Sequence, residues 1–236
     1  MSTFFLESIT CPHCGDERER RVAHSVNGQR APHLREQILR GSFQHVVCED
    51  CGEPFVINEP FVYVDLPRRQ WVHVYATEQE AEWRLMEAET REALEIAGGP
   101  SAPPASRLML QGVQARTVFG LDGLREKLLC SEAGLDDARL ELLKLELGTA
   151  PGGIPLSTGY HLRLQACADD ELVLVAGGVD EAIAVQLVLP RAGYDELAAA
   201  PERWQGLYQE LVAGTYVDLG RFLIPGAADA RAASQS

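Results

Sequence analysis

Two short stretches with matching spacing decide the fold of the N-terminal third: CPHCG at residues 11–15 and CEDCG at residues 48–52. In each stretch a glycine follows the second cysteine and permits a backbone turn that faces amide N–H groups towards the sulfurs. Two such turns supply four thiolates, the tetrahedral set that zinc prefers in closed structural sites. We therefore predict one structural zinc ion. Its predicted ligands are Cys11, Cys14, Cys48 and Cys51.

The segment between the two cysteine turns is long for a zinc finger, but its pattern is regular. It holds 33 residues between Cys14 and Cys48, more than common finger spacings allow. Its residues predict a strand at 19–26, a short helix at 33–40 and a strand at 43–48. With these elements in place, the cysteine turns can meet as neighbouring turns of one small sheet.

Two other uses of the four cysteines stay open at this point. A pair of redox-active CxxC disulfides is the main alternative, although such motifs normally begin a helix and neither pair here does. Iron is the lesser alternative, because ligand identity alone does not separate it from zinc. His13 lies between the first two thiols and is expected to be exposed. Cys130 and Cys167 stand alone in apolar segments, which predicts buried free thiols.

Residues 61–75, FVYVDLPRRQWVHVY, predict a β-hairpin that turns at Pro67. Strand alternation predicts that its four valines share one face and four aromatic residues the other. We expect the following helix to cover the aromatic face, and the alternative is an exposed patch that recognises a partner chain or stacks on bases. The valines are Val62, Val64, Val72 and Val74, and the possible partner-binding residues are Phe61, Tyr63, Trp71 and Tyr75.

The pattern changes from strands to helices after the hairpin. Thr77 and Glu80 form the reciprocal capping pair typical of a helix start, and Gly98 can end that helix. GGPSAPPAS at 98–106 favours neither helix nor sheet and predicts a linker. The elements expected beyond it are helices at about 122–132, 137–147, 192–200 and 202–213, strands over HLRLQACA, ELVLVAG and AIAVQLVLP, and a final strand at about 216–223.

These elements predict an α+β protein. We expect an N-terminal zinc-ribbon-like β module with an inserted short helix, followed by a mixed α/β region. The module and the long helix after it would form a first domain over residues 1–97. The linker at 98–106 would connect it to an α+β domain over 107–224, and the tail at 225–236 is predicted to be disordered.

Composition and charge narrow the classes of function. The net charge of −14 over 236 residues disfavours general affinity for nucleic acid or anionic membranes. Residues 1–74 carry eight arginines and ten acidic residues, a net charge of −2, so the remainder carries −12. An apolar run of membrane-spanning length and a secretory signal are both missing, which predicts a cytoplasmic protein without membrane association. A reducing cytoplasm favours metal binding or buried thiols over disulfides.

Several motifs resemble those of the bacterial CpXC domain. They are CPHCG, the stretch from Asn27 through PHLREQILRGSF, CEDCG and FVYVDLPRRQWVHVY, and LREKLLCSEAGLDDARLELLKLEL at 124–147 is similar to segments that accompany that domain. The resemblance covers roughly residues 4–147. It implies a zinc-ribbon-like module carried by the four cysteines of the two turns, and it implies no particular activity.

The sequence favours a non-enzymatic interaction or adaptor module that binds zinc, with a protein partner or a second copy of the chain. No catalytic residue is predicted. The alternative is an enzyme or enzyme subunit with a site between the two halves of the chain that uses Asp136, Asp137 and Glu141, although an aspartate before a helix is an ordinary cap. A weaker alternative is nucleic-acid binding by the arginines of the insert. These arginines are Arg18, Arg20, Arg21, Arg30, Arg35 and Arg40.

Overall fold

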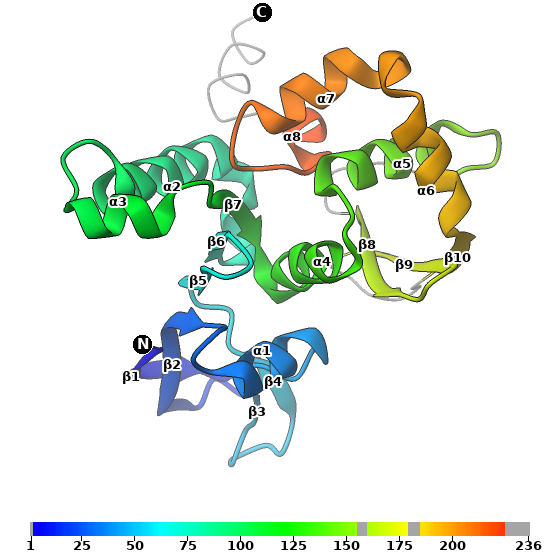
Figure 1. Cartoon of the computed structure of the whole chain (residues 1–236). Helices are drawn as coiled ribbons and strands as arrows, with labels where there is room; N and C mark the ends of the chain where they lie inside the picture. The colour runs from blue at the N-terminus through cyan, green and yellow to red at the C-terminus, as the bar shows by residue number, and fades with distance from the viewer. Residues whose placement is uncertain (1, 155–159, 179–184, 225–236) are drawn as a thin grey trace, which may run out of the picture. The chain divides into compact units, whose positions relative to one another are not determined.

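The computed structural model describes residues 2–154, 160–178 and 185–224. It contains an N-terminal strand-rich region with the cysteine turns and a mixed α/β remainder, which confirms the predicted α+β class (Figure 1). The chain forms two compact units, Met1–Glu80 with Ala88–Leu124, and Ala81–Glu87 with Arg125–Ser236.

The predicted division, a domain over 1–97, a linker over 98–106 and a second domain over 107–224, differs from these two units. The reason is strand β7 (Gln114–Phe119), which pairs in parallel with the second strand of the predicted hairpin and so belongs to the first unit. The tail at 225–236 lies outside the described residues.

The first unit is built on a five-stranded sheet with the order β1-β2-β5-β6-β7. Helix α1 (Pro32–Leu39) lies between β2 and β3, which confirms the predicted insert, and Pro32 occupies its first turn because a missing N–H costs nothing there. The strands of the sheet are β1 (Thr3–Thr10), β2 (Glu17–Asn27), β5 (Phe61–Asp65), β6 (Gln70–Tyr75) and β7, and a separate two-stranded sheet contains β3 (His45–Val47) and β4 (Pro54–Val56).

The hairpin of β5 and β6 forms as predicted, but the predicted division of its faces is wrong. Val62 pairs with His73, and Tyr63 pairs with Val72. Residues directly opposite each other in an antiparallel pair share a face, so each face mixes aromatic and aliphatic side chains. Phe61 and Tyr63 lie with Val72 and Val74 on one face, whereas Trp71, His73 and Tyr75 lie with Val62 and Val64 on the other.

Helix α2 (Trp83–Gly98) follows a 3-10 turn, η1 (Thr77–Glu82), so the regular helix begins six residues after the predicted start. Thr90 anchors α2 on the sheet, because its hydroxyl lies 3.3 Å from the Tyr75 hydroxyl and 2.9 Å from Oγ1 of Thr117. Helix α3 (Pro104–Leu110) lies beside α2 and begins within the predicted linker (Figure 1).

The second unit packs helices on a three-stranded antiparallel sheet with the order β10-β9-β8. Its core joins buried leucines of helix α5 to those of the sheet, among them Leu140, Leu164 and Leu174. Its elements are α4 (Gly120–Ala133), which begins in the first unit, α5 (Asp137–Thr149), β8 (Tyr160–Cys167), β9 (Glu171–Gly178), β10 (Val185–Pro190), α6 (Arg191–Ala199), η2 (Pro201–Trp204), α7 (Gln205–Val212) and α8 (Gly220–Leu223).

The structure contradicts the predicted final strand at 216–223. Residues 216–219 are neither helix nor strand, and α8 follows them. Buried side chains, rather than a neighbouring strand, bind the backbone here: Tyr216 N donates to Glu87, and Leu219 N donates to Glu141. Apolar residues of this segment contribute to the core of the unit, where Val217 is fully buried.

Candidate metal centre

The two cysteine turns have the same backbone structure, although they join different pairs of strands. In the turn between β1 and β2, Cys11 N donates to Asp16 O at 2.8 Å and Gly15 N donates to Cys11 O at 3.0 Å. In the turn between β3 and β4, the equivalent bonds from Cys48 N and Gly52 N measure 2.9 and 3.0 Å. The equal spacing of the two motifs therefore produces two equal turns.

The turns bring all four sulfurs to one point, as the sequence predicted. The Sγ atoms lie within 4.8 Å of one another, with 3.9 Å between Cys11 and Cys51 and 3.7 Å between Cys14 and Cys48. Four sulfurs around one zinc ion at about 2.3 Å stand about 3.8 Å apart if the geometry is tetrahedral. The cluster therefore has the size of a four-thiolate metal site.

The surroundings shift the thiol pKa values of the cluster in opposite directions. Backbone hydrogen bonds lower the pKa values of Cys14 and Cys51, but burial and the neighbouring thiols outweigh them and raise both. N–H groups of Cys51 and Asp50 lower the pKa of the Cys48 thiol to about 7. Cys11 and Cys48 are buried, whereas Cys14 and Cys51 are exposed, so the first cysteine of each turn faces the protein and the second faces solvent.

His13 is exposed on the first turn, as expected. Its Nε2 lies 3.2 Å from the Pro54 carbonyl oxygen, a contact with the second turn rather than with the sulfurs. The cluster therefore consists of four cysteines, and four thiolates would fill a tetrahedral coordination sphere.

Four cysteines on two matching turns define a protein with a cluster of thiols that could hold a metal ion. The family described as CpXC protein matches residues 9–144, more than half of the chain. The chain belongs to this family, as its motifs indicated. No curated protein and no solved structure matches it.

The structure separates the four aromatic residues predicted as a partner-binding set. Phe61, Tyr63 and Tyr75 are buried and Trp71 is half-buried. Phe61 packs against Phe43 with ring centroids 5.5 Å apart, on the face opposite to Trp71 and Tyr75. The four side chains therefore do not form one surface, and their role in partner binding stays a prediction.

The carboxylates of the alternative enzyme hypothesis have structural partners. Asp136 caps α5, because its Oδ1 accepts hydrogen bonds from the N–H groups of Ala138 and Arg139. Asp137 pairs with Lys127 at 3.0 Å. Glu141 is buried in α5 and pairs with a lysine of the same helix. These contacts agree with the capping interpretation that the sequence favoured.

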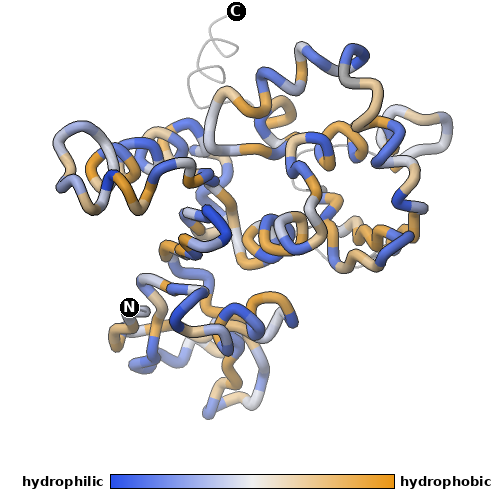
Figure 2. Tube along the Cα trace, in the orientation of Figure 1, coloured by the Kyte–Doolittle hydropathy of each residue, from blue (hydrophilic) through white to orange (hydrophobic). Residues whose placement is uncertain are grey.

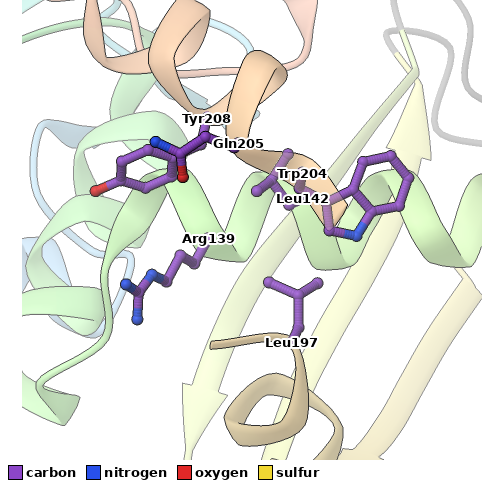
Figure 3. A pocket seen from close by; sticks show the side chains of 6 residues that line it. All are labelled: Arg139, Leu142, Leu197, Trp204, Gln205 and Tyr208. Atoms are coloured by element: carbon purple, nitrogen blue, oxygen red, sulfur yellow. The ribbon is translucent and has the colours of Figure 1, made fainter. Parts of the chain in front are cut away.

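A shallow pocket in the second unit lies between α5, α6 and the start of α7 (Figure 3). Its volume is about 40 Å³, room for about three water molecules. None of the described side chains that line it is a carboxylate, thiol or imidazole, so it offers no nucleophile and base pair. The lining residues are Arg139, Leu142, Leu197, Trp204, Gln205 and Tyr208.

Four of the six arginines of the insert lie beside acidic side chains, whereas Arg21 lies over the Phe4 ring and Arg30 is exposed. Arg18 pairs with Asp16 and Glu49, and Arg20 also reaches Glu49 at 3.6 Å. Arg40 pairs with Glu36 on α1, and Arg35 is buried near Asp65. Each of these four arginines has an acidic neighbour, which weakens the hypothesis of nucleic-acid binding.

The two remaining cysteines lie outside the cluster. Cys130 is buried as predicted, and burial raises the pKa of its thiol well above the usual value. Cys167 is only half-buried, because it stands at the end of β8, where Arg191 approaches its sulfur at 3.9 Å.

Sequence reasoning missed a cluster of buried ions in the second unit. Lys144 Nζ bridges Glu126 and Glu141 at 2.8 and 2.6 Å, and Arg163 bridges Glu126 and Asp218. The carboxylates of the three acidic residues lie within 4.8 Å of one another, but lysine and arginine already neutralise them, so we interpret the cluster as an ion-pair network. The only local signal was the i, i+3 spacing of Glu141 and Lys144.

Proposed function

We propose that this CpXC protein is a non-enzymatic interaction module whose first unit is held together by one structural zinc ion. The observation that carries this proposal is the closed cluster of four cysteine sulfurs at the spacing of a tetrahedral thiolate site. A catalytic zinc site keeps an open position for water, whereas four thiolates fill the coordination sphere. Zinc bound in this way stabilises a fold and shapes a surface.

Apolar side chains beside the cluster support a role in binding another protein. The register of β3 and β4 puts Val47, Pro54 and Val56 on one face of the two-stranded sheet, together with the exposed His45 opposite Val56. Val47 is 59% exposed and Val56 is 41% exposed. Two exposed valines next to a metal-stabilised turn form a rigid apolar patch, the kind of surface that marks protein interfaces. A protein partner or a second copy of the chain is the proposed occupant.

Elemental analysis of protein purified without added metal tests the metal. We expect about one zinc per chain in the wild type and none in the double variant Cys48→Ser, Cys51→Ser. Cys130→Ser, Cys167→Ser is the matched control and should keep its zinc, because these cysteines lie outside the cluster. Freshly reduced wild-type protein without metal would instead support redox chemistry, and iron in place of zinc would correct the identity of the ion.

Co-purification from native lysate and size-exclusion chromatography test the interaction. The variant Val47→Ser, Val56→Ser should retain zinc and lose a stoichiometric partner or dimerisation. Ile96→Ser is the control, because Ile96 is 71% exposed on α2, away from the cysteine turns in sequence. A zinc-loaded wild-type protein that stays monomeric, captures no partner and shows measurable turnover would refute the proposal.

A further inference from the structure

A buried charge network occupies the interior of the second unit. Lysine and arginine bridge carboxylates from α4, α5 and the segment before α8, and Arg163, at 12% exposure, is the most accessible of the side chains. Charges at such depth are stable only when they are paired and hydrogen-bonded. The network consists of Glu126, Glu141, Lys144, Arg163 and Asp218.

The network and its neighbours bind the backbone of the 216–224 segment. Tyr216 N donates to Oε1 of Glu87 at 2.9 Å, Val217 O accepts from Nζ of Lys127 at 2.6 Å, and Leu219 N donates to Oε2 of Glu141 at 3.0 Å. Residues 216–219 have no strand or helix to satisfy their backbone groups. The docking of this segment therefore depends on the charge state of buried side chains.

The network contains one more carboxylate than cation. Three carboxylates share Lys144 and Arg163, while the adjacent pair of Lys127 and Asp137 at 3.0 Å is neutral by itself. An unpaired negative charge away from water is costly, and one proton would remove it. The other titratable groups that face the network in this unit are His161 on β8, whose Nδ1 lies 3.2 Å from Nη2 of Arg163, and Cys130 on α4.

Glu141 is the carboxyl group whose negative charge is balanced least by nearby cations. Although burial opposes ionisation of Glu126, Lys144 and Arg163 outweigh it and lower the pKa of Glu126. Burial acts against Asp218 as well, but Arg163 dominates and holds its pKa far below the usual range. Burial raises the pKa of Glu141 to about 7, because Lys144, which it shares with Glu126, and the more weakly acting Lys127 do not outweigh burial and the neighbouring carboxylates.

We infer that the buried charge network is a proton-sensitive clasp, which holds the 216–224 segment tightly when Glu141 carries a proton and loosens as that proton is lost. A proton on Glu141 removes the excess negative charge of the network, and Oε2 of Glu141 can still accept from Leu219 N. When the segment opens, Glu141 reaches water and returns towards its ordinary pKa. A group whose pKa is higher in the docked state stabilises docking at low pH, and this stabilisation is lost as pH rises towards 7.

Hydrogen exchange of the full chain tests the clasp, with peptides over 216–224 measured between pH 5.5 and 8 and corrected for intrinsic rates. A single linked proton should increase the opening equilibrium on the order of tenfold between pH 5.5 and 7, and about twofold from pH 7 to 8. Opening that does not change with pH, or that decreases as pH rises, would overturn the inference.

Two variants assign the effect to one group. Glu141→Gln is a neutral isostere and should keep the segment protected at every pH in the range. His161→Gln is the control and should keep the wild-type dependence on pH; if it alone removes the dependence, the histidine is the switch and the inference about Glu141 is wrong. If Glu141→Gln does not fold, carbon-13 NMR can follow the titration of the Glu141 carboxyl in the wild-type protein instead. An ordinary titration near pH 4.5 would refute the clasp.

Discussion

Gly15 and Gly52 have almost the same backbone conformation, with φ of +78° and +77°. Each follows the second cysteine of its turn and donates its N–H to the carbonyl of the first cysteine. No atom lies within 4 Å of the position that a Cβ would occupy at either glycine, so the requirement for glycine is conformational rather than steric. Only the backbone angle selects the residue here.

Gly52→Ala should therefore lower the stability of the metal-bound protein by about 1–2 kcal/mol, the cost of a left-handed conformation with a Cβ. Thermal melting and chelator competition measure the loss of stability and of metal affinity. Gly206→Ala in α7 is a suitable control, because it also has open space but no positive φ, and it should be neutral or stabilising by up to about 1 kcal/mol. Equal behaviour of the two variants would show that the turn tolerates other conformations.

At the scale of single elements, Asp136 determines the start of α5. Its Oδ1 caps two backbone N–H groups, and its Oδ2 accepts from the Tyr208 hydroxyl at 2.8 Å. Asp136→Ala should reduce the free energy of unfolding by about 1–2 kcal/mol in urea denaturation, whereas Asp136→Asn should retain most of it. Asp195→Ala, on an exposed side chain, should cost less than about 0.5 kcal/mol. A loss of the same size in the asparagine variant would point to charge rather than capping.

The elements that were predictable from the sequence are those with local signals. The cysteine turns, α1 and α5 follow from spacing, a proline and a capping aspartate within a few residues. Strand β7 and the faces of the hairpin depend on pairing between distant residues. Val62 opposite His73 fixes the faces, and a shift of the register by one residue would exchange them.

Helix α3 of the first unit is a further element that the local sequence did not predict. Figure 2 shows hydrophobic residues on α3, where Leu108 is 74% exposed and Met109 is 60% exposed. GGPSAPPAS at 98–106 was expected to be a linker, because glycine and proline favour neither helix nor sheet, yet α3 begins within it at Pro104. Proline is tolerated in the first turn of a helix, so this composition did not exclude one.

At the scale of the whole molecule, the buried charge network makes the second unit sensitive to loss of one cation. Lys144→Met removes the cation that bridges Glu126 and Glu141, and the buried carboxylates should destabilise the unit by about 3–5 kcal/mol. Arg203→Gln breaks an exposed pair with Glu146 instead and should cost less than about 1 kcal/mol. Guanidinium denaturation measures both. A mild effect of Lys144→Met would mean that the network relaxes or takes up a proton at little cost.

Removal of the metal should affect the two units unequally, because all four cysteines lie in the first unit and the hydrophobic core around α5 lies in the second. Metal binding to four-cysteine peptides contributes about 10–16 kcal/mol, comparable to the stability of a whole domain. A chelator under reducing conditions should therefore abolish hydrogen-exchange protection in β1 to β4 while β8 to β10 keep theirs. Readdition of zinc should restore the lost protection, and restoration should fail in the double variant Cys48→Ser, Cys51→Ser. Loss of protection throughout both units would show that the metal supports the folding of the entire chain. Unchanged protection in β1 to β4 would show that the ion has no structural role.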